Sequence, residues 1–216
     1  MSTSARQSVI VLWVTLIVFG SILALMAQGA GPLPGDLTLT RWLQDSLPLD
    51  GLMGSLLGYI SRIVWFLPIA FFTVALVRRQ WLAALSLFVA GATSLLFSNA
   101  LKLLVARARP SAELVRVYDP SEGYSFPSTT ALLSVVLLGM ICYLVGRERP
   151  RRSFVLAMLC VSLLSVLASG ISRIYVGEHW ATDILGGWFF GGTWLLILIA
   201  LHRWWSSRQA RLRVPQ

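Results

Sequence analysis

The stretch Ser8–Gln28, SVIVLWVTLIVFGSILALMAQ, contains no charged side chain. A helix of roughly 20 apolar residues is long enough to cross the hydrocarbon core of a bilayer, which is about 30 Å thick. A signal peptide is the alternative, because the small residues Ala27, Gly29 and Ala30 lie at its end. We favour a membrane anchor, since the apolar run exceeds a usual signal-peptide core and only Arg6 charges the preceding segment.

Five more segments along the chain meet the same criteria. They are Ser55–Val77, Trp81–Val105, Ser128–Gly146, Ser153–Ile171 and Ile184–Leu201. The 216 residues are 56% hydrophobic and 12% charged, whereas soluble domains carry about 25% charged residues. No internal repeat or long linker divides the chain. We therefore expect an all-α polytopic membrane protein, a bundle of six transmembrane helices forming a single domain over residues 1–216.

The basic residues are concentrated on one side of this six-span arrangement. Eleven of the 18 fall there: Arg6, Arg78, Arg79, Arg147, Arg149, Arg151, Arg152, Arg203, Arg208, Arg211 and Arg213. The positive-inside rule makes that side cytoplasmic. We expect a multi-pass protein of the cell inner (plasma) membrane, with cytoplasmic N- and C-termini and a basic cytoplasmic tail at about residues 203–216. The net charge of +9 is thus a topology signal, and nucleic acid is not an expected partner.

The longest connection on the other side covers about residues 29–54. It opens with Gly-Pro-Leu-Pro-Gly and then alternates apolar residues with charged ones; the members are Leu37, Leu39, Arg41, Trp42, Leu43, Asp45 and Leu47. This pattern is typical of a short amphipathic helix at the membrane interface. An ordinary surface loop with a few apolar residues is the alternative.

Candidate functional residues lie on the same non-cytoplasmic side. Lys102, the only lysine, stands near the end of the third span. Arg109 follows seven residues later, and two helical turns would place both on one face, with Pro110 ending the helix. The segment Tyr124–Thr130 leads into the fourth span, where Ser128 or a neighbouring threonine can cap the helix and leave backbone N–H groups free.

The segment Ser172–Asp183 joins the fifth and sixth spans and holds the one histidine on this side, His179. On a helix, Asp183 lies at i+4 from His179 and can accept a hydrogen bond from the imidazole. That bond fixes the tautomer and leaves the other ring nitrogen free for nucleophilic attack. Charges near membrane depth indicate function. The three cations Lys102, Arg109 and Arg173 around one histidine predict a phosphate-binding site.

Three motifs carry a resemblance to a known family. Lys-x6-Arg-Pro at Lys102–Pro110, Pro-Ser at Pro127–Ser128 and Ser-Arg-x5-His-x3-Asp at Ser172–Asp183 resemble the signatures of the type-2 phosphatidic acid phosphatase superfamily, which is related to vanadium haloperoxidases. The resemblance implies a lipid phosphatase that works through a phosphohistidine, without metal or other cofactor, at an extracytoplasmic (periplasmic) site.

The resemblance also implies a role for each matching residue. His179 is the expected nucleophile and Asp183 its orienting partner. Phosphate binding is expected from Lys102, Arg109, Ser128 and Arg173. The expected partners are a phosphorylated membrane lipid as substrate and the membrane itself; the sequence makes no prediction of oligomeric state.

The second motif departs from the family pattern. The family reads Pro-Ser-Gly-His there, and its histidine is thought to protonate the leaving oxygen, whereas this chain has Thr129 and Thr130. A threonine hydroxyl titrates far outside the useful range for a general acid. His202 cannot substitute, because it is expected at the cytoplasmic end of the sixth span. The acids on the correct side, any of which would need a raised pKa to act, are Glu113, Asp119, Glu122 and Glu178.

The missing acid bears on the substrate. General acid catalysis is typically worth about 10²–10⁴-fold, so its loss harms cleavage of an ester with an alkoxide leaving group. A diphosphate releases a phosphate, whose second pKa is about 6, and needs little protonation. We therefore favour a polyprenyl diphosphate or a similar lipid diphosphate. The alternatives are a family member that binds a phosphorylated lipid or partner without turnover, and a lipid phosphotransferase.

Overall fold

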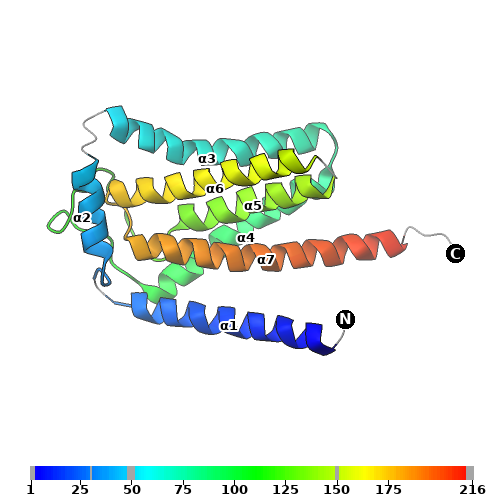
Figure 1. Ribbon diagram of the computed structural model, residues 1–216, viewed down its shortest axis with the longest axis horizontal. Coiled ribbons are helices and arrows are strands. Elements are labelled where there is room, and N and C mark those ends of the chain that lie inside the picture. Colours follow the sequence, from blue (N-terminus) through cyan, green and yellow to red (C-terminus); the bar gives the residue numbers. More distant parts are fainter. Residues whose placement is uncertain (1–2, 30, 48–51, 149–150, 213–216) are drawn as a thin grey trace.

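The computed structural model describes residues 3–29, 31–47, 52–148 and 151–212, and in these ranges it contains seven helices and no strand (Figure 1). The helices are α1 Thr3–Ala27, α2 Asp36–Ser46, α3 Leu52–Val77, α4 Trp81–Val105, α5 Thr129–Arg147, α6 Arg152–Tyr175 and α7 Ala181–Leu212. The six long helices lie roughly side by side, and the short α2 lies across the end of the bundle where α6 finishes and α7 begins (Figure 1).

Five of the described helices, α1, α4, α5, α6 and α7, are long and apolar enough to cross a membrane. The prediction of an all-helical, multi-pass membrane protein is therefore confirmed. The count of six spans is not. Helix α3, Leu52–Val77, is not among these five, so its span stays a prediction.

Helix α5 forms the centre of the bundle. Its sequence is apolar on all sides, and most of its side chains are buried, as expected for a helix surrounded by others. The contact with α7 is close because α7 carries glycine where the two backbones meet: a Cβ on Gly187 would lie 2.7 Å from the Ser128 carbonyl oxygen, and one on Gly191 would lie 2.7 Å from that of Leu132. Such small residues, four apart, are the usual means of close packing between membrane helices. This contact fixes the start of α7 against the start of α5.

Two boundaries differ from the sequence predictions. Helix α7 continues through Arg203–Leu212, so the first part of the predicted basic tail is helical, because this stretch has no glycine or proline. Arg208 lies over the Trp204 ring, 4.4 Å from its centroid. In the loop predicted at about 29–54, a helix does form at α2, with Trp42 exposed and Leu43 buried. Its contact with a membrane interface stays a prediction.

Candidate active site

Three polar segments meet beneath α2, at one end of the bundle. Backbone hydrogen bonds connect them. The Ser125 N–H donates to the Arg107 carbonyl at 2.9 Å, the Ser128 N–H donates to the Asp183 carbonyl at 3.0 Å, and the Tyr118 N–H donates to the Val176 carbonyl at 2.9 Å. The loop after α4, the start of α5 and the turn before α7 are thereby held as one unit.

His179 and Asp183 form the centre of this unit. His179 lies just before α7 rather than on it, and Asp183 lies in the first turn of that helix. The two side chains still meet: His179 Nδ1 is 3.6 Å from Asp183 Oδ2, and both residues are buried, with His179 only 3% exposed. Asp183 Oδ2 also accepts the Trp180 N–H at 2.8 Å. The predicted proximity is thus present, at a distance slightly beyond a hydrogen bond.

Burial lowers the pKa of His179 below its ordinary value, because the charged imidazolium loses its hydration. The carboxylates of Asp183 and Glu178 act in the opposite direction, but burial prevails. The imidazole is therefore neutral at neutral pH, which is the form a nucleophile requires.

The lowered pKa of His179 predicts how the activity depends on pH. A neutral imidazole is kept until the pH falls below its lowered pKa, so the acidic limb of kcat/KM is expected below the ordinary imidazole value of about 6.5. The chain has 2 histidines, so NMR titration of ¹⁵N-labelled histidine can follow both rings directly, with His202→Ala assigning them. A His179 midpoint at or above about 6.5 would contradict the prediction.

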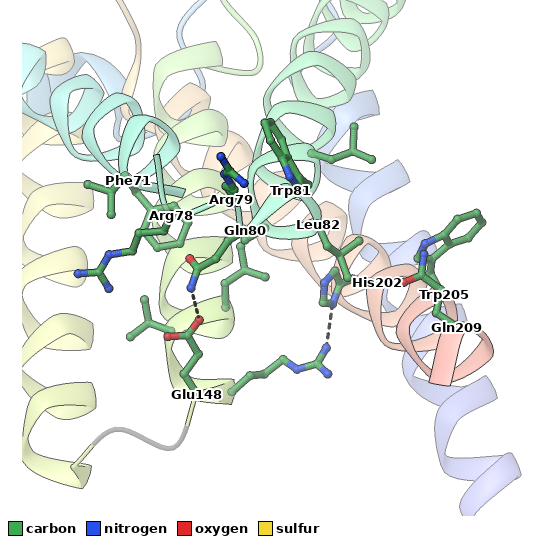
Figure 2. Close-up of a pocket in the computed structure, with 16 residues that line it drawn as sticks. Phe71, Arg78, Arg79, Gln80, Trp81, Leu82, Glu148, His202, Trp205 and Gln209 are labelled. Atoms are coloured by element: carbon green, nitrogen blue, oxygen red, sulfur yellow. Dashed lines mark hydrogen bonds between the residues drawn. The ribbon is translucent and has the colours of Figure 1, made fainter. Parts of the chain in front are cut away.

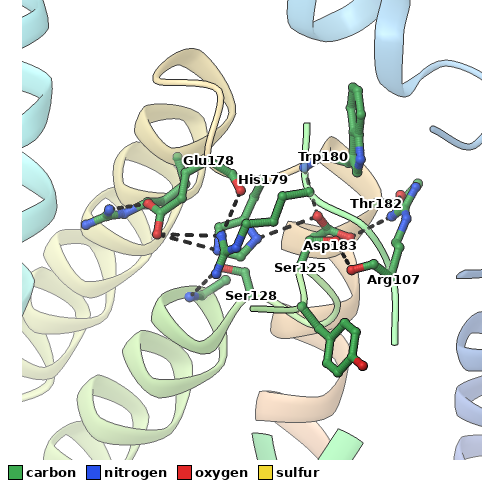
Figure 3. A network of polar contacts seen from close by, with 12 residues as sticks. Arg107, Ser125, Ser128, Glu178, His179, Trp180, Thr182 and Asp183 are labelled. Carbon is green, nitrogen blue, oxygen red and sulfur yellow. Dashed lines mark hydrogen bonds and ion pairs between the residues drawn. The ribbon is translucent and has the colours of Figure 1, made fainter. Parts of the chain in front are cut away.

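The second oxygen of Asp183 binds a buried arginine that the sequence analysis missed. Arg107 is fully buried, and its Nη1 donates to Asp183 Oδ1 at 2.6 Å and to the Thr182 hydroxyl at 2.7 Å. Its Nη2 donates to Asp36 Oδ2 at 2.6 Å. Asp36, at the start of α2, in turn accepts the Thr182 N–H at 2.9 Å. Figure 3 shows His179 between Glu178 on one side and the Asp183–Arg107 pair on the other.

The charged side chains of this network are buried, which restricts how they can be arranged. Fully buried charges must be paired and hydrogen-bonded, and Arg107 satisfies two buried carboxylates at once through its planar fork. It therefore holds Asp183 in one orientation beside His179. One signal in the sequence pointed to Arg107, since it lies between Lys102 and Arg109 in a stretch where charge is costly.

Lys102 and Arg109 do not share a helix face, so that part of the prediction is wrong. Helix α4 ends at Val105, and Ala106 takes a left-handed conformation with φ of 51° that turns the chain away. Pro110 therefore does not end the helix. Both cations instead hold the same loop: Lys102 Nζ donates to the Tyr124 carbonyl at 2.6 Å, and Arg109 Nε donates to the carbonyls of Glu122 and Gly123, each at 3.2 Å.

Glu178 lies among the cations of the site. Its carboxylate binds Arg173 Nη1, is 3.8 Å from Arg109 Nη1 and accepts the Ser121 hydroxyl at 3.0 Å. The same carboxylate is 3.9 Å from His179 Nε2. Glu178 thus places a negative group beside the ring nitrogen that faces away from Asp183, close to the position where a substrate phosphate is expected.

The protonation state of Glu178 follows from these contacts. Burial alone would raise its pKa, but the His179 ring when it is protonated, the charge of Arg173 and the hydrogen bonds from Arg173 and Ser121 lower it below the ordinary value for glutamate. Glu178 is therefore ionised at neutral pH in this state. A general acid must carry a proton near the working pH, and an ionised carboxylate carries none.

The remaining predicted residues also lie in this region. Arg173 is in the last turn of α6 and also lies 3.9 Å from Asp119. Ser128 is buried and caps α5, accepting the Ala131 N–H at 3.4 Å, as the sequence predicted. At the altered general-acid position, Thr130 lies in the first turn of α5, and the neighbouring Thr129 hydroxyl bonds to the Ser98 hydroxyl at 2.8 Å.

The fold and the site together define a multi-pass helical membrane protein with a buried histidine–carboxylate pair beside a cluster of cations. The PAP2 superfamily model matches residues 83–207, more than half of the chain. The chain belongs to the PAP2 superfamily, and the prediction from the three motifs is confirmed.

Three relatives are similar in sequence. Phosphatidylglycerophosphatase B of Bacillus subtilis (strain 168) is 32% identical over 139 residues, covering 63% of this chain and 64% of the relative. Undecaprenyl-diphosphatase of Sulfolobus acidocaldarius is 28% identical over 154 residues, covering 69% and 68%. Lipid A 4'-phosphatase of Bacteroides thetaiotaomicron is 27% identical over 174 residues, covering 73% of each. The match to the B. subtilis relative thus spans slightly less than two thirds of that protein.

Two solved structures share the fold. The crystal structure of a transmembrane PAP2-type phosphatidylglycerolphosphate phosphatase from B. subtilis superposes with a TM-score of 0.72 at 20% identity, covering 88% of this chain and 95% of that one. The structure of LpxE from Aquifex aeolicus gives a TM-score of 0.63 at 18% identity, covering 78% and 96%. At these identities the likeness concerns the fold alone.

Proposed function

We propose that the protein is a membrane lipid phosphatase that transfers a phosphoryl group first to His179 and then to water. The observation that carries this proposal is the buried His179–Asp183 pair, with Glu178 beside the second ring nitrogen and Arg109 and Arg173 on that carboxylate. The printed names of its relatives, which include a phosphatidylglycerophosphatase, an undecaprenyl-diphosphatase and a lipid A phosphatase, support the same class of reaction.

In the proposed first step, neutral His179 attacks the terminal phosphorus of the substrate through Nε2. The bond from phosphorus to the leaving oxygen breaks, and the imidazole becomes a positively charged phosphohistidine. Asp183, held by Arg107, stabilises that charge through Nδ1–H. The cations Lys102, Arg109 and Arg173 stabilise the negative charge that the phosphoryl oxygens carry in the transition state.

In the second step, water attacks the phosphohistidine. The phosphorus–nitrogen bond breaks, inorganic phosphate leaves, and His179 returns to its neutral form. Each round consumes one water molecule and requires no redox partner. The protein's contribution is positioning and charge stabilisation, which is the usual source of catalysis in phosphoryl transfer.

We further propose that the substrate is a lipid diphosphate, for example a polyprenyl diphosphate. Thr129 is bonded to Ser98, and Glu178 is ionised, so neither supplies a proton to the leaving oxygen. A leaving group that is itself a phosphate departs without that help. The sidedness follows the positive-inside prediction, with the site on the extracytoplasmic face of the inner membrane and both termini in the cytoplasm.

The test is phosphate release by purified protein in detergent with EDTA, comparing a polyprenyl diphosphate with a phosphatidate, and with His179→Ala as the blank. Release from the diphosphate that exceeds release from the phosphatidate and is absent in the blank supports the proposal. Retained diphosphate binding without release in the wild type would favour the binding-protein alternative. Product that forms only when a second lipid is added would indicate a phosphotransferase.

The position of Glu178 gives a further prediction for this site. In Glu178→Gln, a neutral amide replaces the carboxylate that competes with substrate for Arg109 and Arg173. We expect KM for the diphosphate and the inhibition constant of inorganic phosphate to fall several-fold, consistent with the usual 0.2–1 kcal/mol scale of a partly exposed ion pair, about 1.4- to 5-fold. Steady-state kinetics measure both. Glu122→Gln, on the nearby loop, is the matched control, and a rise in KM would show instead that Glu178 positions the arginines.

A further inference from the structure

A large cavity lies at the end of the bundle away from His179. Its volume is about 960 Å³, and it opens between the α3–α4 turn, the end of α5 and the last third of α7 (Figure 2). The active site lies where α7 begins, whereas this cavity is lined by His202, Trp205 and Gln209 near the other end of that helix. The proposed reaction uses none of its residues.

The cavity carries positive charge that the described protein does not neutralise. Arg78, Arg79 and Arg147 line it together with one carboxylate, Glu148, which accepts a hydrogen bond from Gln80 at 3.0 Å. In the described ranges, none of these three arginines forms an ion pair with a carboxylate. The site therefore suits an anionic ligand.

Neutral groups hold Arg147 in place. Its Nη1 bonds to His202 Nδ1 at 3.1 Å, to the Tyr143 hydroxyl at 3.2 Å and to the Ser206 hydroxyl at 3.4 Å. Figure 2 shows Gln80 directed at Glu148, with Arg78 and Arg79 on the turn above them. The arginines thus surround the opening from two sides, one fixed on α5 and two on the α3–α4 turn.

An apolar groove meets this cavity. The groove has a volume of about 490 Å³, shares Phe71 and Val74 with the basic cavity, and runs between α3, α5 and α6. Its other walls include Leu138, Phe154 and Ala157, and Ser162 is its one polar residue among those described. A basic pocket that adjoins an apolar groove matches a ligand with a charged head and a hydrocarbon chain.

The rim of the cavity has the composition of a membrane interface. Trp81 is 63% exposed and Trp205 is 51% exposed, and both line the opening. Tryptophan is enriched at the level of lipid headgroups, where its amphipathic ring is stable. The basic pocket is therefore at headgroup depth, and the apolar groove extends toward the hydrocarbon.

We propose that this cavity binds an anionic phospholipid of the leaflet opposite the active site, with the headgroup phosphate at Arg78, Arg79 and Arg147 and an acyl chain in the groove. By the positive-inside prediction that leaflet is cytoplasmic, where anionic lipids attract basic residues near the surface. The bound lipid connects the α3–α4 turn to α5 and α6. The site is separate from catalysis, so its test does not depend on the proposed phosphatase activity.

The experiment uses native mass spectrometry of the full chain in detergent, in a His179→Ala background that prevents turnover. The probes are palmitoyl-oleoyl phosphatidylglycerol and palmitoyl-oleoyl phosphatidylcholine. We expect retention of phosphatidylglycerol over phosphatidylcholine, and a loss of roughly ten- to thirtyfold in affinity for phosphatidylglycerol in the double variant Arg78→Gln/Arg79→Gln. Arg151→Gln/Arg152→Gln is the control, because it removes the same charge at the same end of the bundle outside the cavity.

Two further measurements test whether the ligand that occupies the cavity is a lipid with acyl chains. Ala157→Phe fills the groove and is expected to weaken phosphatidylglycerol retention, with thermal unfolding confirming that the variant is folded. Excess glycerophosphoglycerol, which has the headgroup without acyl chains, is expected to compete poorly. The proposal is overturned by equal loss in both double variants, by full retention in Ala157→Phe, or by complete competition from the chainless headgroup.

Discussion

Thr130→His is expected to raise cleavage of a lipid phosphate monoester by about 10²–10⁴-fold, while cleavage of a lipid diphosphate changes much less. The substitution puts a titrating imidazole in the first turn of α5, at the position where the family pattern has its general acid. A monoester leaves as an alkoxide and gains the full benefit of protonation. A diphosphate leaves as a phosphate and has little to gain.

The most direct test of this prediction is the pH dependence of monoester cleavage by Thr130→His. A general acid works only while protonated, so the added monoester activity is expected at pH values below the pKa of the new histidine, ordinarily about 6.5, and is lost above it. Thr130→Asn is the matched control, since it adds a polar side chain that does not titrate. Equal gains in both variants, or a gain in diphosphate cleavage as large as the gain for the monoester, would contradict the proposed reason for the substrate preference.

The membrane fold could be predicted from the sequence because hydropathy over roughly 20 residues reports directly on the solvent around a helix. The turn after α4 and the end of α7 could not. Helix α4 stops at Val105, where the apolar run ends, although the spacing of Lys102 and Arg109 suggested that it continues; Arg107 leaves the helix and binds two buried carboxylates. That attraction depends on residues far away in the sequence, and no local pattern contains it.

The candidate site was likewise predictable from the sequence only in part. The short spacing between His179 and Asp183 made their contact predictable, and the three motifs identified the cations. The roles of the acids were not predictable, because the pKa of a carboxyl depends on its neighbours in space. Glu178 is surrounded by Arg109, Arg173 and His179, so it differs from the other acids of its face, which the sequence left equivalent.

Arg107→Met is expected to destabilise the protein by about 3–5 kcal/mol, because it leaves the two fully buried carboxylates of Asp36 and Asp183 without a counter-charge. Thermal unfolding in detergent measures the loss. Arg116→Met is the matched control, since the Arg116–Asp45 pair also joins α2 to the loop after α4 but is exposed. An exposed pair contributes about 0–1 kcal/mol, so equal losses in the two variants would contradict the role of burial.

Arg107→Lys separates the positioning role from stability. Lysine keeps the positive charge but lacks the fork that lets Nη1 bind Asp183 while Nη2 binds Asp36, so the folded variant is expected to leave Asp183 less well oriented. The Asp183 charge is then less fully compensated, which raises the pKa of His179 and moves the acidic limb of kcat/KM to higher pH, with a lower kcat and little change in KM. An unchanged limb together with reduced stability would make Arg107 a structural residue, whereas a shifted limb shows that a side chain at an unspecified position of the first motif sets the protonation of the nucleophile.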